Sequence, residues 1–168
     1  MKRLWAPWRA RYISGMDAGQ SPRCIFCEIQ GGDDRDKLIL CRGRYCFVVM
    51  NLYPYNNGHL MVVPYRHVGE LSELSDDERS ELLHLAGRAV DAVREAMRAD
   101  GFNLGINLGR AAGAGVEGHI HLHVVPRWNG DTNFMPVIGE TKVISESLED
   151  TYDKIKSALQ SKKEGDRR

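Results

Sequence analysis

Half of the six histidines in this 168-residue chain lie within five residues, at His119, His121 and His123. The residues between and after them are apolar, which predicts a strand over residues 119–125 with all three imidazoles on one face. Next-but-one side chains on a strand lie about 6.5 to 7 Å apart, close enough for neighbouring rings to share one ligand. The spacing therefore indicates a site for a phosphate group or a metal ion.

A histidine-rich edge strand that turns a polar face to water is the alternative, because antiparallel sheets often leave one face solvated. Three imidazoles with pKa values near 6.5 would repel one another if all were charged, so this alignment favours a bound partner. We therefore interpret the three histidines as a chemical site.

Four cysteines form a second group of reactive side chains. Cys24 and Cys27 have the two-residue spacing of a zinc-ligand pair, and two buried reduced thiols are the alternative. Cys41 and Cys46 lack such a pattern and are expected in the core. No export signal accompanies these cysteines, which favours a reducing compartment and hence the cytoplasm.

The balanced charge implies that any anion binding is local. Lys plus Arg and Asp plus Glu both number 23, so the formal net charge is zero, and neither nucleic acid nor a membrane is expected as a partner. Residues 1–23 form a basic and aromatic N-terminal arm without an apolar stretch. Its arginines and tryptophans could stack on single-stranded nucleic acid, but such a short arm more often packs on its own domain.

The hydrophobic pattern indicates one α+β domain over residues 1–168. A capping box at Ser75–Glu78 begins one long amphipathic helix that ends before Gly101. A second helix is expected near the C-terminus, followed by a frayed tail. The expected strands are residues 38–40, 45–50, 60–63, 102–108 and 119–125, the C-terminal helix is residues 145–161, and the tail is residues 162–168.

Residues 119–125 resemble the signature of the histidine triad (HIT) superfamily of nucleotide hydrolases and transferases. The resemblance extends over residues 24 to 128 and includes residues 24–27, Asn51, Gly58-His59, residues 63–67, residues 101–103 and Asn107. It implies a HIT-like α+β fold, in which a five-stranded antiparallel sheet carries one long helix and a C-terminal helix. It also implies a homodimer with joined sheets.

The resemblance implies catalytic roles for His119, His121, His123 and His59. The central His121 would attack the α-phosphorus of a nucleotide and form a nucleotidyl-histidine. A neutral imidazole does this near pH 7 when its other nitrogen donates a hydrogen bond, usually to a backbone carbonyl. His123 would bond phosphate oxygens or the leaving group, and His59 either orients the triad or is a satisfied, half-buried histidine.

The resemblance also suggests the residues that bind the nucleotide. Asn51 matches a position that contacts the ribose, and Asn107 matches one that places an amide on phosphate. The loop over residues 109–118 offers backbone N–H groups, with Gly115 and Val116 next to the phosphate. Related enzymes usually carry serine or threonine at the position of Val116, so the leaving group is handled differently or by Gly115 and Asn107.

Two further metal ligands follow from the resemblance. In zinc-bearing members of the family, the cysteine pair is completed by histidines that match His67 and His119. Cys24, Cys27, His67 and His119 would then form a structural zinc site. No organic cofactor is expected.

The resemblance narrows the function to a nucleotidyl hydrolase or transferase. Residues 125–128 and 130–134 resemble the branch that cleaves dinucleoside polyphosphates such as diadenosine tetraphosphate, with water or phosphate as acceptor. Residues 135–144 resemble bacterial diadenosine tetraphosphate phosphorylases. One alternative is hydrolysis of adenosine phosphoramidates or aminoacyl-adenylates, and another is a catalytically weak nucleotide-binding protein.

Overall fold

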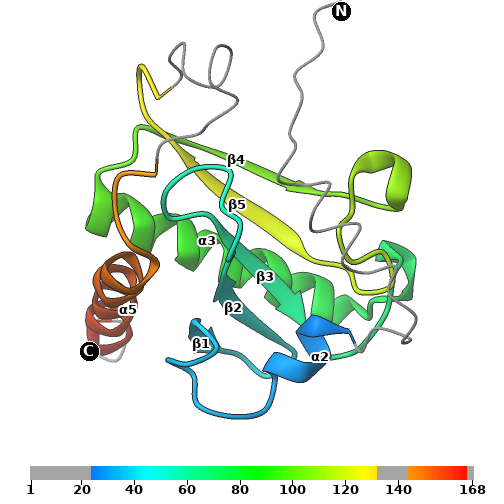
Figure 1. Cartoon of the computed structure of the whole chain (residues 1–168). Coiled ribbons are helices and arrows are strands. Elements are labelled where there is room, and N and C mark those ends of the chain that lie inside the picture. Colours follow the sequence, from blue (N-terminus) through cyan, green and yellow to red (C-terminus); the bar gives the residue numbers. More distant parts are fainter. Residues whose placement is uncertain (1–23, 132–143, 166–168) are drawn as a thin grey trace, which may run out of the picture.

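A computed structural model describes residues 24–131 and 144–165, so the predicted arm of residues 1–23 lies outside it (Figure 1). Within the described residues, one antiparallel sheet of five strands has the order β1-β2-β3-β5-β4. The strands are β1 (Ile39–Arg42), β2 (Cys46–Met50), β3 (Leu60–Pro64), β4 (Gly101–Ile106) and β5 (Leu122–Arg127). The predicted five-stranded antiparallel sheet is confirmed.

The helices lie on both sides of this sheet. They are α2 (Ile25–Ile29), α3 (Asp76–Met97) and α5 (Leu148–Gly165), with 3₁₀ turns η1 (Leu71–Glu73) and η2 (Arg110–Ala112). Helix α3 begins at the predicted capping box, in which Ser75 and Glu78 exchange side-chain and backbone hydrogen bonds. It ends where Arg98 takes a left-handed conformation with φ 52°.

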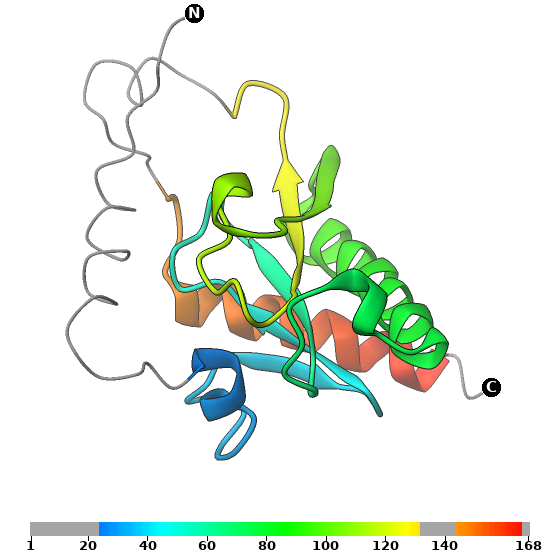
Figure 2. The same cartoon turned by 90° about the vertical axis from the view of Figure 1, so that its right-hand side faces the viewer.

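Two apolar clusters fill the two faces of the sheet. The larger cluster joins one face to α3 and α5, and includes Leu60, Leu122 and Val124. The smaller cluster lies on the opposite face, where Phe26 of α2 packs on residues of β2 and β3. Accordingly, α2 and α3 lie on opposite sides of the sheet (Figure 2). The histidine strand β5 lies between β3 and β4, so its position is fixed from both sides.

Several element ends differ from the predictions, and the physical cause is clear in β1 and α5. Strand β1 starts at Ile39 because Leu38 has φ 55°, a left-handed conformation that does not fit a strand. Helix α5 starts at Leu148 because the Ser147 hydroxyl accepts the N–H of Asp150 as an N-cap. It runs to Gly165, so the predicted frayed tail, residues 162–168, begins too early.

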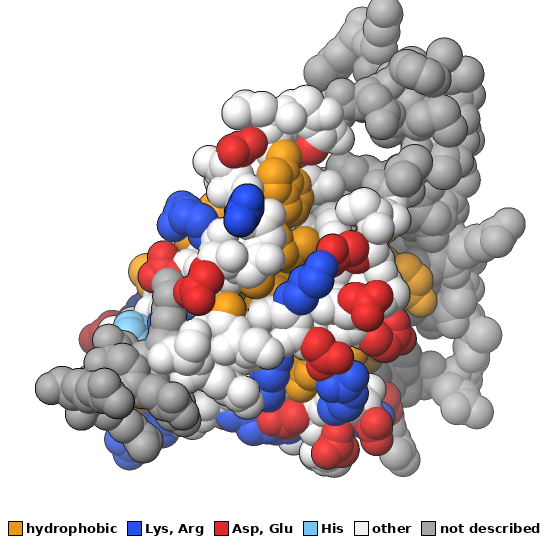
Figure 3. All heavy atoms as spheres, turned by 90° about the vertical axis from the view of Figure 1, so that its left-hand side faces the viewer, with side chains coloured by type: hydrophobic (Ala, Val, Ile, Leu, Met, Phe, Trp, Pro, Cys, Tyr) orange, Lys and Arg blue, Asp and Glu red, His pale blue; other side chains and the backbone are white. Residues whose placement is uncertain are grey.

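The described helices and the charges on one face of the molecule bear on possible membrane or nucleic-acid contacts. Among the described helices, none is long and apolar enough to cross a membrane. Acidic and basic side chains lie interspersed in Figure 3.

The two cysteines outside the predicted zinc pair lie in the sheet. Cys46 is fully buried and Cys41 is half-buried. Burial, reinforced by the carboxylates of Glu81 and Glu78, raises the pKa of Cys46 to about 12. Cys46 therefore stays a neutral thiol, as a core residue should.

Candidate active site and metal-binding cluster

The histidine run straddles the start of β5 and is not one continuous strand. Strand β5 begins at Leu122, so the predicted strand over residues 119–125 starts too early. The N–H of Ile120 bonds to the carbonyl of Val68, outside the sheet ladder, which explains the shorter strand. The predicted alternation nevertheless holds, because Ile120 and Leu122 are buried in the larger core while His121 and His123 contact each other.

His121 lies in the centre of the site and is 5% exposed. Its Nδ1 lies 2.9 Å from the carbonyl oxygen of His119, so Nδ1–H donates there. Burial lowers the pKa of His121, and the bond to this carbonyl only partly opposes that shift. The imidazole is therefore neutral near pH 7 and carries its lone pair on Nε2. A neutral imidazole in this tautomer is a nucleophile.

His59 and His123 form a directed pair beside His121. The backbone N–H of Tyr55 donates to Nδ1 of His59 at 3.0 Å, and the side-chain amide of Asn51 lies 3.3 Å from the same nitrogen. Nδ1 of His59 is therefore the acceptor, and its proton is on Nε2. That Nε2–H donates to Nδ1 of His123 at 3.0 Å. The proton of a neutral His123 consequently lies on Nε2.

Burial keeps His59 uncharged at neutral pH. His59 is 1% exposed, and burial together with the neighbouring His123 and His121 lowers its pKa to about 3. The rings of His121 and His123 meet edge to face, with centroids 4.8 Å apart. His121, whose Nε2 carries a lone pair, thus stands next to His123, whose Nε2 carries the proton when that ring is neutral.

Asn51, predicted to contact a ribose, lies next to this pair. Its amide nitrogen approaches His59, and its Oδ1 accepts the N–H of Tyr53 at 2.9 Å. Its side chain therefore closes the turn after β2 and supports His59. One amide hydrogen remains beyond these two contacts, so the ribose role stays a prediction.

The other predicted binding residues lie along the connection between β4 and β5. Asn107 directly follows β4, whose last residue Ile106 pairs with Leu122 at the start of β5. Continuing this antiparallel register by one residue places Asn107 opposite His121. Val116 packs against the smaller apolar cluster that contains Phe26. The side chain at the position of the family's serine or threonine thus contributes apolar packing.

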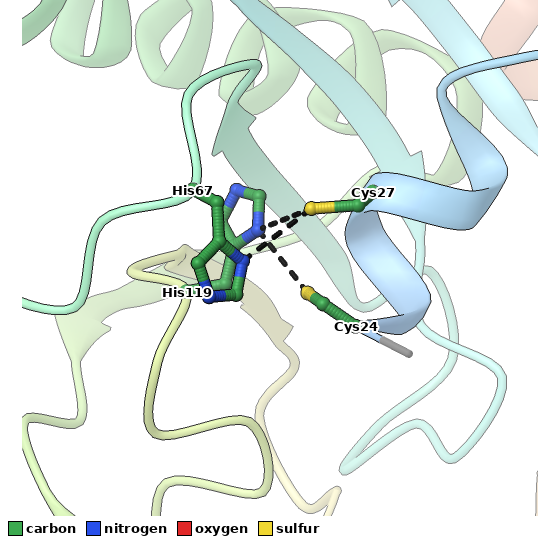
Figure 4. A group of neighbouring side chains, drawn as sticks. All are labelled: Cys24, Cys27, His67 and His119. Carbon is green, nitrogen blue, oxygen red and sulfur yellow. Dashed lines mark hydrogen bonds between the residues drawn. The ribbon is translucent and has the colours of Figure 1, made fainter. Parts of the chain in front are cut away.

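Four side chains converge around His119, the first histidine of the run. Cys24 and Cys27 come from the start of α2, His67 follows β3 and His119 precedes β5 (Figure 4). Their ligand atoms all lie within 4.8 Å of one another. The structure therefore brings together all four residues that the sequence predicted as metal ligands.

The distances in this cluster fit a tetrahedral metal ion. Nδ1 of His119 lies 3.2 Å from Sγ of Cys24 and 3.6 Å from Sγ of Cys27, and Nδ1 of His67 lies 3.4 Å from Sγ of Cys27. Zinc distances of about 2.3 Å to sulfur and 2.0 to 2.1 Å to nitrogen give sulfur-to-nitrogen edges of about 3.5 Å in a tetrahedron. The spacing is the one such an ion requires.

The backbone orients His119 so that one ring nitrogen faces the two cysteines. Its Nε2 lies 2.8 Å from the carbonyl oxygen of Pro64, so Nε2–H donates and Nδ1 keeps its lone pair toward the cysteines. Metal-binding histidines usually donate their second N–H in this way. The carbonyl of the same residue receives Nδ1–H of His121. His119 thus connects the metal cluster directly to the candidate nucleophile.

The sequence predicted no role for two aromatic residues that pack on the histidines. Phe26 packs on both histidines, with its ring centroid 5.4 Å from that of His119 and 4.8 Å from that of His121. Tyr55 stacks on the directed pair, with centroids 4.5 Å from His59 and 5.6 Å from His123. The only signal for Phe26 was its place between the two cysteines, and the signal for Tyr55 was its place before Gly58-His59.

The comparisons with known proteins identify the family and match the fold. Residues 34–130 match the HIT domain family. The AP-4-A phosphorylase of Mycobacterium tuberculosis is 45% identical over 157 residues, which cover 90% of this chain and 80% of that protein. Adenosine 5'-monophosphoramidase hnt1 of Schizosaccharomyces pombe is 32% identical over 106 residues, which cover 63% of this chain and 75% of hnt1.

A solved structure shows the same architecture. The zinc-bound histidine triad family protein from Mycobacterium smegmatis superposes with a TM-score of 0.70 at 28% identity, covering 84% of this chain and 96% of that one. The chain belongs to the HIT domain family. The resemblance and the HIT-like fold predicted from the sequence are both confirmed.

Proposed function

We propose that this protein is an enzyme that cleaves dinucleoside polyphosphates at the α-phosphate, with Nε2 of His121 as the nucleophile. The observation that carries the proposal is the hydrogen bond from Nδ1–H of His121 to the carbonyl of His119, which leaves Nε2 as the buried lone pair. The 45% identity to a protein named AP-4-A phosphorylase supports the choice of substrate.

The chemistry divides into two displacements at phosphorus. In the first, Nε2 of His121 bonds to the α-phosphorus while the bond to the bridging oxygen breaks and the remaining nucleotide leaves. The positive charge on the imidazole is stabilised through Nδ1–H by the carbonyl of His119. His123 donates its Nε2–H toward the oxygens on which negative charge develops, with His59 fixing that tautomer.

In the second displacement an acceptor attacks the nucleotidyl group and restores the imidazole. Water would release a nucleoside monophosphate, and inorganic phosphate would release a nucleoside diphosphate. The name of the 45% identical relative favours phosphate as acceptor. In diadenosine tetraphosphate, attack at an α-phosphorus releases ATP in either case.

The nucleotide would be held by residues around the mouth of this site. Asn51 would bond the ribose with its remaining amide hydrogen. Asn107 and the backbone at Gly115 and Val116 would bond the phosphate, because each lies on the connection that leads into β5. Val116 offers no hydroxyl, so the phosphate contacts of this loop would come from backbone N–H groups.

The test is product analysis with diadenosine tetraphosphate, with and without inorganic phosphate. Phosphate-dependent ADP plus ATP would support phosphorolysis, and AMP plus ATP would support hydrolysis. A His121→Ala variant should lose at least about a thousandfold in kcat, as removal of a nucleophile does. Turnover of an adenosine phosphoramidate alone would move the protein to the other branch of the family. Absence of any turnover would favour the nucleotide-binding alternative.

The metal cluster is proposed to hold a structural zinc ion. Two thiolates and two imidazoles are a preferred donor set for zinc, and the ion would tie α2 to the start of β5. Elemental analysis should find stoichiometric zinc in the wild-type protein and much less in Cys24→Ser. The matched control is Cys41→Ser, a half-buried cysteine outside the cluster that should keep the metal. Negligible zinc in all three proteins would contradict the proposal.

The protein is also proposed to form a homodimer through β4 and to work in the cytoplasm, where thiolate ligands stay reduced. Strand β4 lies at one edge of the sheet, and its Leu104 is 47% exposed. An exposed edge strand can pair with a second copy and so continue the sheet. Sedimentation equilibrium should show a dimer that Leu104→Lys weakens, whereas a wild-type monomer would rule this assembly out.

A further inference from the structure

The loop between β2 and β3, residues 51–59, is tied to the far end of β5 by one buried side chain. Asn56 is 7% exposed and donates through Nδ2 to two acceptors. These are the carbonyl oxygen of Pro126 at 3.0 Å and Oδ2 of Asp131 at 2.9 Å. Figure 1 shows this loop reaching the end of β5. Asn56 therefore fixes the loop to the strand that carries His123.

The acceptor that Asn56 uses is itself held in place. Arg127 donates to both oxygens of Asp131, from Nε at 2.6 Å and from Nη2 at 2.8 Å. The backbone N–H of Trp128 donates to Oδ2 at 3.2 Å. A planar guanidinium bound to both oxygens gives a carboxylate one orientation. The position of the Asn56 amide is therefore set by a rigid partner.

The residues beside Asn56 control the proton on His59. Tyr55, its neighbour, supplies the N–H that donates to Nδ1 of His59. The carbonyl of Asn56 accepts the N–H of His59 at 3.2 Å. A shift of Asn56 would displace both contacts, and Nδ1 of His59 would lose the shorter of its two donors, leaving only the Asn51 amide at 3.3 Å.

We propose that Asn56 is a positioning residue for the pair His59 and His123. It holds the loop on the end of β5, keeps the N–H of Tyr55 on Nδ1 of His59, and thereby keeps the proton of His123 on Nε2, where it faces the phosphate. The catalytic consequence rests on the proposed function. The tautomers assigned to His59 and His123 do not depend on the proposed function, because they follow from the hydrogen bonds alone.

The direct test is long-range ¹H–¹⁵N NMR of the histidine rings in the full-length, metal-loaded protein at neutral pH. In the wild type, His59 and His123 should both carry their proton on Nε2. In Asn56→Ala the released loop should give a mixture of the two tautomers at both rings. Unchanged tautomers in Asn56→Ala would overturn the proposal.

A matched control separates this role from a general loosening of the loop. The hydroxyl of Thr151, in α5, donates to Oδ1 of the neighbouring Asn57 at 3.1 Å and so ties the same loop to another element. Thr151→Val breaks that bond at nearly constant volume, and the histidine tautomers should remain those of the wild type. A tautomer mixture in Thr151→Val would show that loosening the loop at another anchor has the same effect. That result would refute the specific role of Asn56.

Kinetics supply the second readout. In Asn56→Ala, kcat should fall about 10- to 100-fold while KM changes less than about threefold, as expected for a group that orients a reacting side chain. If Asn56→Ala does not fold, Asp131→Ala removes one acceptor from the more accessible side and should give the same changes in smaller measure. An inactive wild type would defeat the proposed function and leave the NMR test intact.

Discussion

Acidification should destabilise this protein through His59, and a His59→Gln variant should lack that part of the effect. His59 is 1% exposed, and its pKa in the folded protein is lowered to about 3, chiefly by burial. In the unfolded chain the same imidazole titrates near 6.5. The two states therefore bind protons differently across the range between these values.

The sign follows from proton uptake. Below about pH 6.5 the unfolded chain takes up a proton at His59 that the folded protein does not accept until about pH 3. The free energy of unfolding therefore falls as the pH is lowered through this window. Between pH 7.5 and pH 5 the loss from this one residue amounts to about 2 kcal/mol.

The assay is urea unfolding at pH 7.5 and pH 5 with the metal content held constant. His119 and His121 contribute in the same direction, because burial lowers their pKa values too, but they are common to both proteins. The stability difference between wild type and His59→Gln should shrink by about 2 kcal/mol at the lower pH. Parallel pH dependence in wild type and His59→Gln would refute the reasoning.

Substitutions at two further positions, Phe26 and Glu78, test the packing of the site and the capping of α3. Phe26→Ala should lower the free energy of unfolding by about 3 to 5 kcal/mol and also lower kcat, because Phe26 is 4% exposed and packs on His121. Phe26→Leu should cost less than about 1.5 kcal/mol by urea unfolding, and an equal loss in both variants would contradict the packing role. Glu78→Gln should destabilise the protein by about 1 to 3 kcal/mol at pH 7, since Glu78 bonds Arg66 twice and caps α3 at Ser75. The pKa of Glu78 is lowered to about 2, first by Arg66, so its contribution is present above pH 4.5 and is lost toward pH 2. Thermal unfolding across that range should therefore show a flatter pH dependence in the variant.

The parts of the fold that depend on local pattern were predictable from the sequence. The start of α3 follows from its capping box, and the two faces of the histidine run follow from alternation, even though β5 begins at Leu122. Helix α2 was not predicted, because five residues are too few to show a helical period. The start of β1 was missed because it depends on the left-handed conformation of Leu38, an uncommon choice for that residue type.

The candidate site also has parts that the sequence predicted and parts that it did not. The four members of the Cys/His cluster and the proposed catalytic histidines could be named from spacing and family resemblance. The contacts that orient them could not, because Asn56 meets Asp131 across 75 residues and His59 meets His123 across 64. Phe26 is the clearest example. The sequence around it shows only an apolar residue, whereas its position against His121 depends on tertiary packing. Tertiary contacts of this kind leave no periodic signal in a sequence.

The central claim, that His121 carries the nucleotidyl group, is tested most directly by trapping the intermediate. The protein would be mixed with diadenosine tetraphosphate, quenched rapidly in base to preserve a phosphorus–nitrogen bond, and analysed by mass spectrometry of its peptides. An adenylyl group on His121, absent from His121→Asn, is the expected result. Turnover without any adduct, or an adduct on another residue that persists in His121→Asn, would contradict the account.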